Sequence, residues 1–112
     1  MPSENYEIHD PSFKKLIFGN AGVDVLWSGG RWCEGPAYLP AGRYLIWSDI
    51  PNDRVMRWDE MTGEVSVLQT PANNQNGHTV DHMGRLIACE HRGRAVSRIE
   101  FDGTRKVLAD SY

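Results

Sequence analysis

The chain has 112 residues, of which 40% are hydrophobic and 24% are charged, an ordinary composition for one small globular domain. Its formal net charge of -3 gives nucleic acids and anionic membranes no basic surplus to attract. Its apolar runs are too short to span a bilayer, and the polar start MPSENYEIHD does not resemble a secretory signal. We therefore expect a cytoplasmic protein without nucleic-acid or membrane partners.

The first 24 residues have no sustained hydrophobic period and are expected to form an N-terminal arm. Within this arm, the run FKKLIF (residues 13–18) has the composition of either a short helix or an edge strand. The arm leads into the first run that is typical of a β-strand, VDVLW (residues 23–27).

From residue 23 onward, short runs rich in β-branched and aromatic residues alternate with turn-forming residues. In chain order the runs are VDVLW, PAYLP, RYLIWSD, RVMRWD, EVSVLQ, HTVD, RLIACE, AVSRIEF and KVLAD. Glycine or a Pro, Asn or Asp turn former separates them, and none is long enough for a useful amphipathic helix. This spacing predicts an all-β fold.

A repeat gives the clearest indication of architecture. The segment GRYLIWSD begins at Gly42 and the similar segment GRLIACE begins at Gly84, 42 residues later. Leu68 and Leu108, near the ends of the two units, are 40 residues apart, as one-residue deletions in the turns would cause. Four strands with a period near 40 residues are typical of a propeller blade. We predict two blades of four-stranded antiparallel sheet, near residues 25–70 and 71–112; a single sandwich with coincidental turn spacing is the alternative.

Glu34 and Asn76 precede the two units and are also 42 residues apart. The innermost strand of each blade lines the central channel of a propeller, so both side chains are expected to point toward one axis. A carboxylate and an amide oxygen that converge suit a hard divalent cation. Pairing of Glu34 with a nearby arginine is the alternative, and spacing alone does not separate the two.

The segments WCEGPAYLPAGRYLIWSDIPNDRVMRWD and NNQNGHTVDHMGRLIACEHRGRAVSRIEFDG resemble the gluconolactonase family, also called the senescence marker protein and luciferin-regenerating enzyme family. The resemblance extends from about residue 23 to the C-terminus. It implies a six-bladed β-propeller, incomplete in this chain, with one divalent metal ion at the channel mouth. Calcium is the expected ion, with zinc, manganese, magnesium or iron as alternatives. The implied reaction is hydrolysis of sugar lactones, in carbohydrate metabolism.

The resemblance implies that Glu34, in the Glu-Gly-Pro motif, is the first metal ligand. The family's other ligands, an asparagine and an aspartate, come from later blades that this sequence does not contain, and no catalytic residue is assigned. Asn76, His78 and His91 are predicted to line the channel. We interpret His78 as a histidine satisfied by hydrogen bonds rather than a ligand, and Glu90 with His91 as rim residues.

Two blades cannot close a propeller, so the strand edges and apolar faces would stay exposed. A fragment of a longer protein is the explanation we favour; blades from another polypeptide, or a ring of three copies, are alternatives. We expect the N-terminal part of a metal-dependent sugar-lactone hydrolase that is inactive alone. The alternative function is a non-catalytic blade module that assembles with itself or with another chain.

The two cysteines, Cys33 and Cys89, are expected to be reduced, half-buried thiols. A disulfide between them is the less favoured interpretation. Neither lies in a C-x-x-C pair, so the sequence does not support a zinc ribbon or a thioredoxin-like site.

Overall fold

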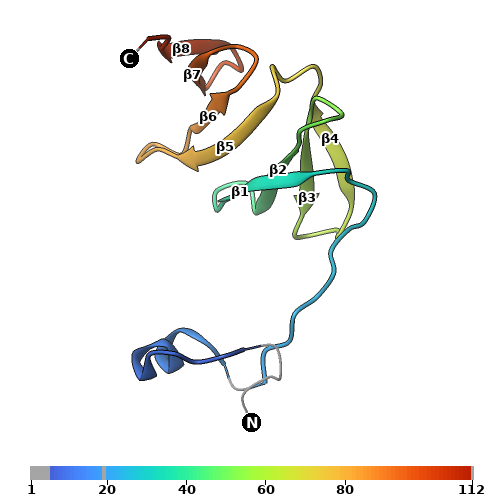
Figure 1. The fold of residues 1–112 in the computed structure, drawn as a ribbon, viewed down its shortest axis with the longest axis vertical. Helices are drawn as coiled ribbons and strands as arrows, with labels where there is room; N and C mark the ends of the chain where they lie inside the picture. Colours follow the sequence, from blue (N-terminus) through green and yellow to red (C-terminus); the bar gives the residue numbers. More distant parts are fainter. Residues whose placement is uncertain (1–5, 19, 112) are drawn as a thin grey trace.

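The computed structural model describes residues 6–18 and 20–111, which contain eight strands in two antiparallel sheets (Figure 1). Each sheet has four strands in chain order, as predicted, and we call the sheets blade 1 and blade 2. Blade 1 consists of β1 (Cys33–Leu39), β2 (Tyr44–Asp49), β3 (Arg54–Asp59) and β4 (Val65–Gln69). Blade 2 consists of β5 (Gln75–Val80), β6 (Leu86–Glu90), β7 (Ala95–Ile99) and β8 (Arg105–Ala109).

The N-terminal arm lies away from both blades (Figure 1). It contains the 3-10 helix η1 (Pro11–Leu16), which decides between the two interpretations of the FKKLIF run. Asp10 caps this helix by accepting a hydrogen bond from the Ser12 backbone N–H at 2.8 Å. Residues 1–5 and 19 of the predicted arm lie outside the described residues. Within the described part of the chain, no helix is long and apolar enough to cross a membrane.

The run VDVLW, predicted as a strand, belongs to neither sheet. The other runs correspond to strands, although β1 and β5 begin earlier than the runs PAYLP and HTVD suggested. An isolated strand has no neighbouring edge to satisfy its backbone hydrogen bonds, so sequence preference alone does not create one.

The two blades repeat the same strand register. Asp49 ends β2 opposite Arg54, and Glu90 ends β6 opposite Ala95, so these strands are related by 41 residues. The inner strands β1 and β5 keep the 42-residue offset. One of the expected one-residue deletions therefore falls between the first and second strands. Both inner strands also contain a register shift near their beginning, which is typical of a β-bulge.

The hydrophobic core lies between the blades. Ile46 and Val55 of blade 1 are 0% exposed, and Leu86 of blade 2 packs into the same cluster, together with Leu39 and Ala72. Complete burial of a side chain of this size stabilises a fold by about 1.5–3 kcal/mol. The blades are therefore held face to face by the same kind of contact that holds the layers of a sandwich.

Candidate functional site

The inner strands β1 and β5 approach each other closely where Gly35 meets Asn76. A Cβ atom built on Gly35 would lie 1.9 Å from the Asn76 carbonyl oxygen, and Gly35 has a φ of 68°. Only glycine accepts both this close approach and this backbone conformation without strain. Glu34, the residue before Gly35, is therefore held at the contact between the two blades, beside its repeat counterpart Asn76.

Glu34 is exposed, and Asn76 is half-buried. Within residues 6–18 and 20–111, no hydrogen bond or ion pair joins the Glu34 carboxylate to another side chain, so the pairing with an arginine is not seen. The described residues also contain no cluster of three or more His, Cys, Asp or Glu side chains that could hold a metal ion. Glu34 is thus available as one ligand, but the described residues do not complete a metal site.

His78 joins the two inner strands. Its Nδ1 atom lies 2.7 Å from the Gly35 carbonyl oxygen, to which an Nδ1–H donates, and its Nε2 atom lies 2.9 Å from the Gln75 side-chain oxygen. Burial lowers the pKa of His78 and outweighs the hydrogen bond to Gly35, which raises it. The Nδ1–H hydrogen bond ties the His78 ring to β1. The interpretation of His78 as a histidine satisfied by hydrogen bonds rather than a ligand stays a prediction.

His91 directly follows β6, whose last residue Glu90 pairs with Gln75 at the beginning of β5. It therefore lies at the same end of blade 2 as Asn76. Its side chain is exposed, and its backbone N–H donates to the Asn74 carbonyl oxygen at 3.3 Å.

Sequence reasoning missed a buried carboxylate in each blade, although it had interpreted one of the two, Glu90, as a rim residue near a strand end. In blade 1 this carboxylate is Asp49, which is 0% exposed and accepts five hydrogen bonds. The donors are the backbone N–H groups of Arg31 and Trp32, the Asn52 amide, and two nitrogens of Arg54. Burial raises the pKa of Asp49, but these donors together lower it to about 2.

Glu90 has the equivalent position in blade 2 and is 4% exposed. Arg105 of β8 donates to its two carboxylate oxygens at 2.7 Å each, and Asn73 and Ser97 add further hydrogen bonds. The hydrogen bond from Arg105 lowers the pKa of Glu90 and outweighs burial. Each buried carboxylate thereby fixes the linker that leads into the inner strand of its blade.

The signal for these two residues was present in the repeat. Asp49 and Glu90 end the equivalent runs RYLIWSD and RLIACE, where a strand on a buried face would otherwise be apolar. A carboxylate kept at such a position needs donors around it, because an unpaired buried charge is strongly unfavourable.

The cysteine prediction was correct in one respect and wrong in the other. Cys33 and Cys89 are free thiols, but both are exposed rather than half-buried. Cys33 is the first residue of β1, and Cys89 lies near the end of β6.

Comparisons with known proteins agree with this geometry. Residues 32–111 match the family described as SMP-30/Gluconolactonase/LRE-like region. A solved gluconolactonase from Xanthomonas campestris is 41% identical with a TM-score of 0.72, over 78% of this chain and 29% of that one. A second solved structure, assigned as a gluconolactonase by family, is 36% identical with a TM-score of 0.82, over 93% of this chain and 36% of that one.

The gluconolactonase of Zymomonas mobilis is 23% identical over 116 residues, which cover 91% of this chain and 32% of that protein. More distant solved structures, 13% and 22% identical, share the propeller-type fold alone. The chain belongs to the SMP-30/gluconolactonase/LRE-like family. It spans about a third of the length of the relatives that it matches.

Proposed function

We propose that this chain is the two-blade part of a metal-dependent sugar-lactone hydrolase of the gluconolactonase type, and that it is inactive alone. Family membership and the relatives named gluconolactonase support the reaction class. Because two blades correspond to about a third of the relatives' length, a ring of about six blades fits the complete proteins.

The observation that carries the proposal is the position of Glu34. Its carboxylate is exposed, has no side-chain partner among the described residues, and follows the repeat symmetry that puts Asn76 on the adjacent strand. Carboxylate and amide oxygens are ligands that calcium and other hard divalent cations prefer. The type of donor fits such an ion.

The number of donors falls short, because a hard cation takes six or more oxygen ligands and these two side chains offer only two of them. In this proposal Glu34 supplies one ligand, and blades outside these 112 residues supply the rest. No catalytic step is assigned to this chain for that reason.

The test is hydrolysis of glucono-δ-lactone, followed by pH-stat with Ca²⁺, Zn²⁺ or Mn²⁺. The 112-residue chain is compared with a chimera that joins it to the part of the Xanthomonas campestris gluconolactonase that it does not cover. We expect no turnover by the chain alone and metal-dependent turnover by the chimera. Glu34→Gln should lower kcat/KM of the chimera by at least about 100-fold.

Glu64→Gln is the matched control, because Glu64 is an exposed glutamate in the turn before β4. It should leave turnover within about two-fold, as expected for a surface substitution. Strong turnover by the isolated monomer would refute the inactivity, and an active Glu34→Gln chimera would refute the ligand role.

The alternative function, a non-catalytic module that assembles with another chain, is supported by the exposed apolar side chains before β1. Val23 is 63% exposed and Val25 is 86% exposed. Exposed apolar residues grouped in one segment indicate an interaction surface. A chimera without turnover under any metal would favour this function.

A further inference from the structure

Ser48 of β2 carries a buried hydroxyl group that is not hydrogen-bonded. The residue is 1% exposed, and its Oγ atom has no hydrogen-bonding partner within residues 6–18 and 20–111. A buried hydroxyl of this kind gives up its hydrogen bonds to water and gains none in exchange, which destabilises the folded state. Alanine would fill nearly the same space without this loss, so packing alone does not explain a serine at this position.

The strand register places Ser48 beside Glu34. The two residues are direct partners in the antiparallel pair of β1 and β2. Such partners lie on one face of the sheet with their Cβ atoms about 4.5–5.5 Å apart, so a serine hydroxyl can reach a glutamate carboxylate there. Ile46, two residues before Ser48 and therefore on the same face, packs into the core with Leu86 of blade 2. The hydroxyl thus lies between Glu34 and the contact of the two blades.

Blade 2 shows that the fold does not require this arrangement. The residue equivalent to Ser48, 41 residues later, is Cys89, and its partner on the inner strand is Gly77. Asn76, the counterpart of Glu34, falls inside the register shift of β5 instead of opposite a residue of β6. Of the two described blades, blade 1 alone therefore sets a hydroxyl group opposite the proposed metal ligand.

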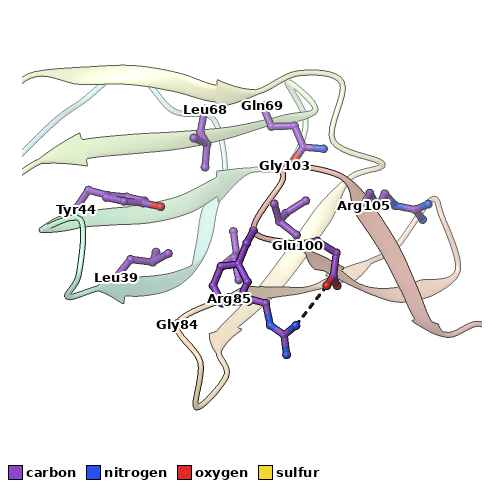
Figure 2. A pocket seen from close by; sticks show the side chains of 12 residues that line it. Leu39, Tyr44, Leu68, Gln69, Gly84, Arg85, Glu100, Gly103 and Arg105 are labelled. Carbon is purple, nitrogen blue, oxygen red and sulfur yellow. Dashed lines mark hydrogen bonds and ion pairs between the residues drawn. The ribbon is translucent and has the colours of Figure 1, made fainter.

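The cavity between the blades does not explain the serine. This cavity of about 530 Å³ is lined by Leu39 and Tyr44, which end β1 and begin β2, whereas Ser48 lies toward the other end of this strand pair (Figure 2). Two charged residues of the cavity, Arg85 and Glu100, already bind each other at 3.3 Å. We therefore expect the partner of the Ser48 hydroxyl on the side of Glu34.

We infer that Ser48 is a positioning residue for Glu34: its hydroxyl donates a hydrogen bond to the Glu34 carboxylate and orients that carboxylate toward a divalent cation. Carboxylates that bind metal ions are usually hydrogen-bonded themselves, and loss of such a bond weakens metal binding by about 10- to 100-fold. Because it concerns Glu34 as a ligand, this role rests on the proposed function. It also accounts for a hydroxyl that lowers the stability of the metal-free protein.

The test compares metal affinity with stability in the chimera that joins this chain to the remaining part of the Xanthomonas campestris gluconolactonase. Isothermal titration calorimetry measures the binding of Ca²⁺ and Mn²⁺, and thermal unfolding measures the stability of the metal-free protein. Ser48→Ala should weaken binding by about 10- to 100-fold. It should leave the unfolding temperature unchanged or raise it, because it removes an unsatisfied hydroxyl. A residue that only supported the fold would lower both quantities together.

Ser97→Ala is the matched control, because Ser97 is a buried serine of blade 2 whose hydroxyl already donates to Glu90. This substitution should lower the unfolding temperature by about 2 °C or more. It should change metal affinity by less than about two-fold, since it lies away from Glu34.

The variants Ser48→Thr and Ser48→Val separate the hydroxyl from the size of the side chain. Threonine and valine have nearly the same shape, so any overpacking is common to both. The threonine variant should bind the cation at least about 10-fold more tightly than the valine variant, because it alone keeps the donor.

Glu34→Gln distinguishes failure of this inference from failure of the proposed function. If Glu34→Gln weakens metal binding but Ser48→Ala does not, the role of Ser48 is overturned and the proposed function stands. If the unmodified chimera binds neither cation, or Glu34→Gln binds as tightly as it does, both fall. Equal affinities of the threonine and valine variants, or a lower unfolding temperature of metal-free Ser48→Ala, would also overturn the role of Ser48.

Discussion

The two blades keep a buried carboxylate at the same position but neutralise it with different strands. In blade 1, Asp49 binds Arg54 from the adjacent β3, whereas in blade 2, Glu90 binds Arg105 from the outer β8. At the position of Arg54, blade 2 has Ala95. The longer glutamate reaches a more distant arginine. The repeat therefore keeps the buried carboxylate and its contact with the linker, but not the position of the arginine that pairs with it.

The blades differ most at the glycines of their inner strands. A Cβ atom on Gly35 would overlap the Asn76 carbonyl, whereas the equivalent Gly77 has its nearest neighbour, Cys89, at 3.9 Å. Gly35→Ala should therefore lower the free energy of unfolding by about 3 kcal/mol or more, because overpacking adds to left-handed strain. Urea unfolding measures this difference.

Gly77→Ala is the matched control and should cost less than about 1 kcal/mol. An equal cost at both glycines would contradict the close contact between β1 and β5. In the chimera with the remaining blades, a larger cost at Gly77 would indicate that a further inner strand packs there.

Removing either buried charge tests the next largest difference between the blades. Asp49→Asn and Glu90→Gln each remove the buried charge to which an arginine donates, half-buried Arg54 in blade 1 and exposed Arg105 in blade 2, which should cost about 2–4 kcal/mol. Asp49 accepts backbone as well as side-chain donors, so we expect the larger loss in blade 1. Chemical unfolding of both variants checks the order, and a larger loss for Glu90→Gln would reverse our comparison.

The pH dependence of stability should follow the same carboxylates. The pKa of Asp49 is lowered from 3.8 to about 2 by folding, so its ionised form stabilises the native state at pH values above 3.8. This contribution, about 2 kcal/mol, should disappear as the pH falls from 4 toward 2. The pKa of Glu90 is also lowered, and its contribution is lost on acidification in the same direction.

The measurement is the free energy of unfolding of the wild type and Asp49→Asn at several pH values between 6 and 2. The difference between them should shrink as Asp49 becomes protonated. A difference that stays constant to pH 2 would show that the Asp49 charge does not stabilise the fold.

The smallest expected effect separates two of the histidines of blade 2, His78 and His91. His78→Ala removes the hydrogen bond to Gly35 and should cost about 1–2 kcal/mol at pH 7.5. Because burial lowers the pKa of His78, the neutral ring favours the folded state, and this stabilisation should fall on acidification below pH 6.5. His91→Ala, at an exposed position, should change stability by less than about 0.5 kcal/mol.

Thermal and urea unfolding at pH 7.5 and pH 5.5 provide this comparison. Equal losses of stability for the two histidine variants would show that the hydrogen bond between His78 and Gly35 does not stabilise the contact between the inner strands.

Much of the fold was predictable because its information is local and repeated. Eight of the nine apolar runs between turn residues correspond to strands, and the repeat made Glu34 and Asn76 equivalent before any contact was known. The family motifs pointed to Glu34 as a ligand in the same way. Strand formation of this kind depends on neighbours that lie next to each other in the chain.

Contacts between segments distant in sequence were decided only by the tertiary structure. The approach of Gly35 to Asn76 and the burial of Glu90 depend on how two sheets pack, which no run of residues specifies. For residues 23–27 the sequence indicates a strand, but a strand also requires a paired neighbour, and neither sheet includes this segment. The sequence by itself therefore determined the blades and their symmetry. Packing determined that the carboxylates of Asp49 and Glu90 are buried and hydrogen-bonded, whereas that of Glu34 is exposed.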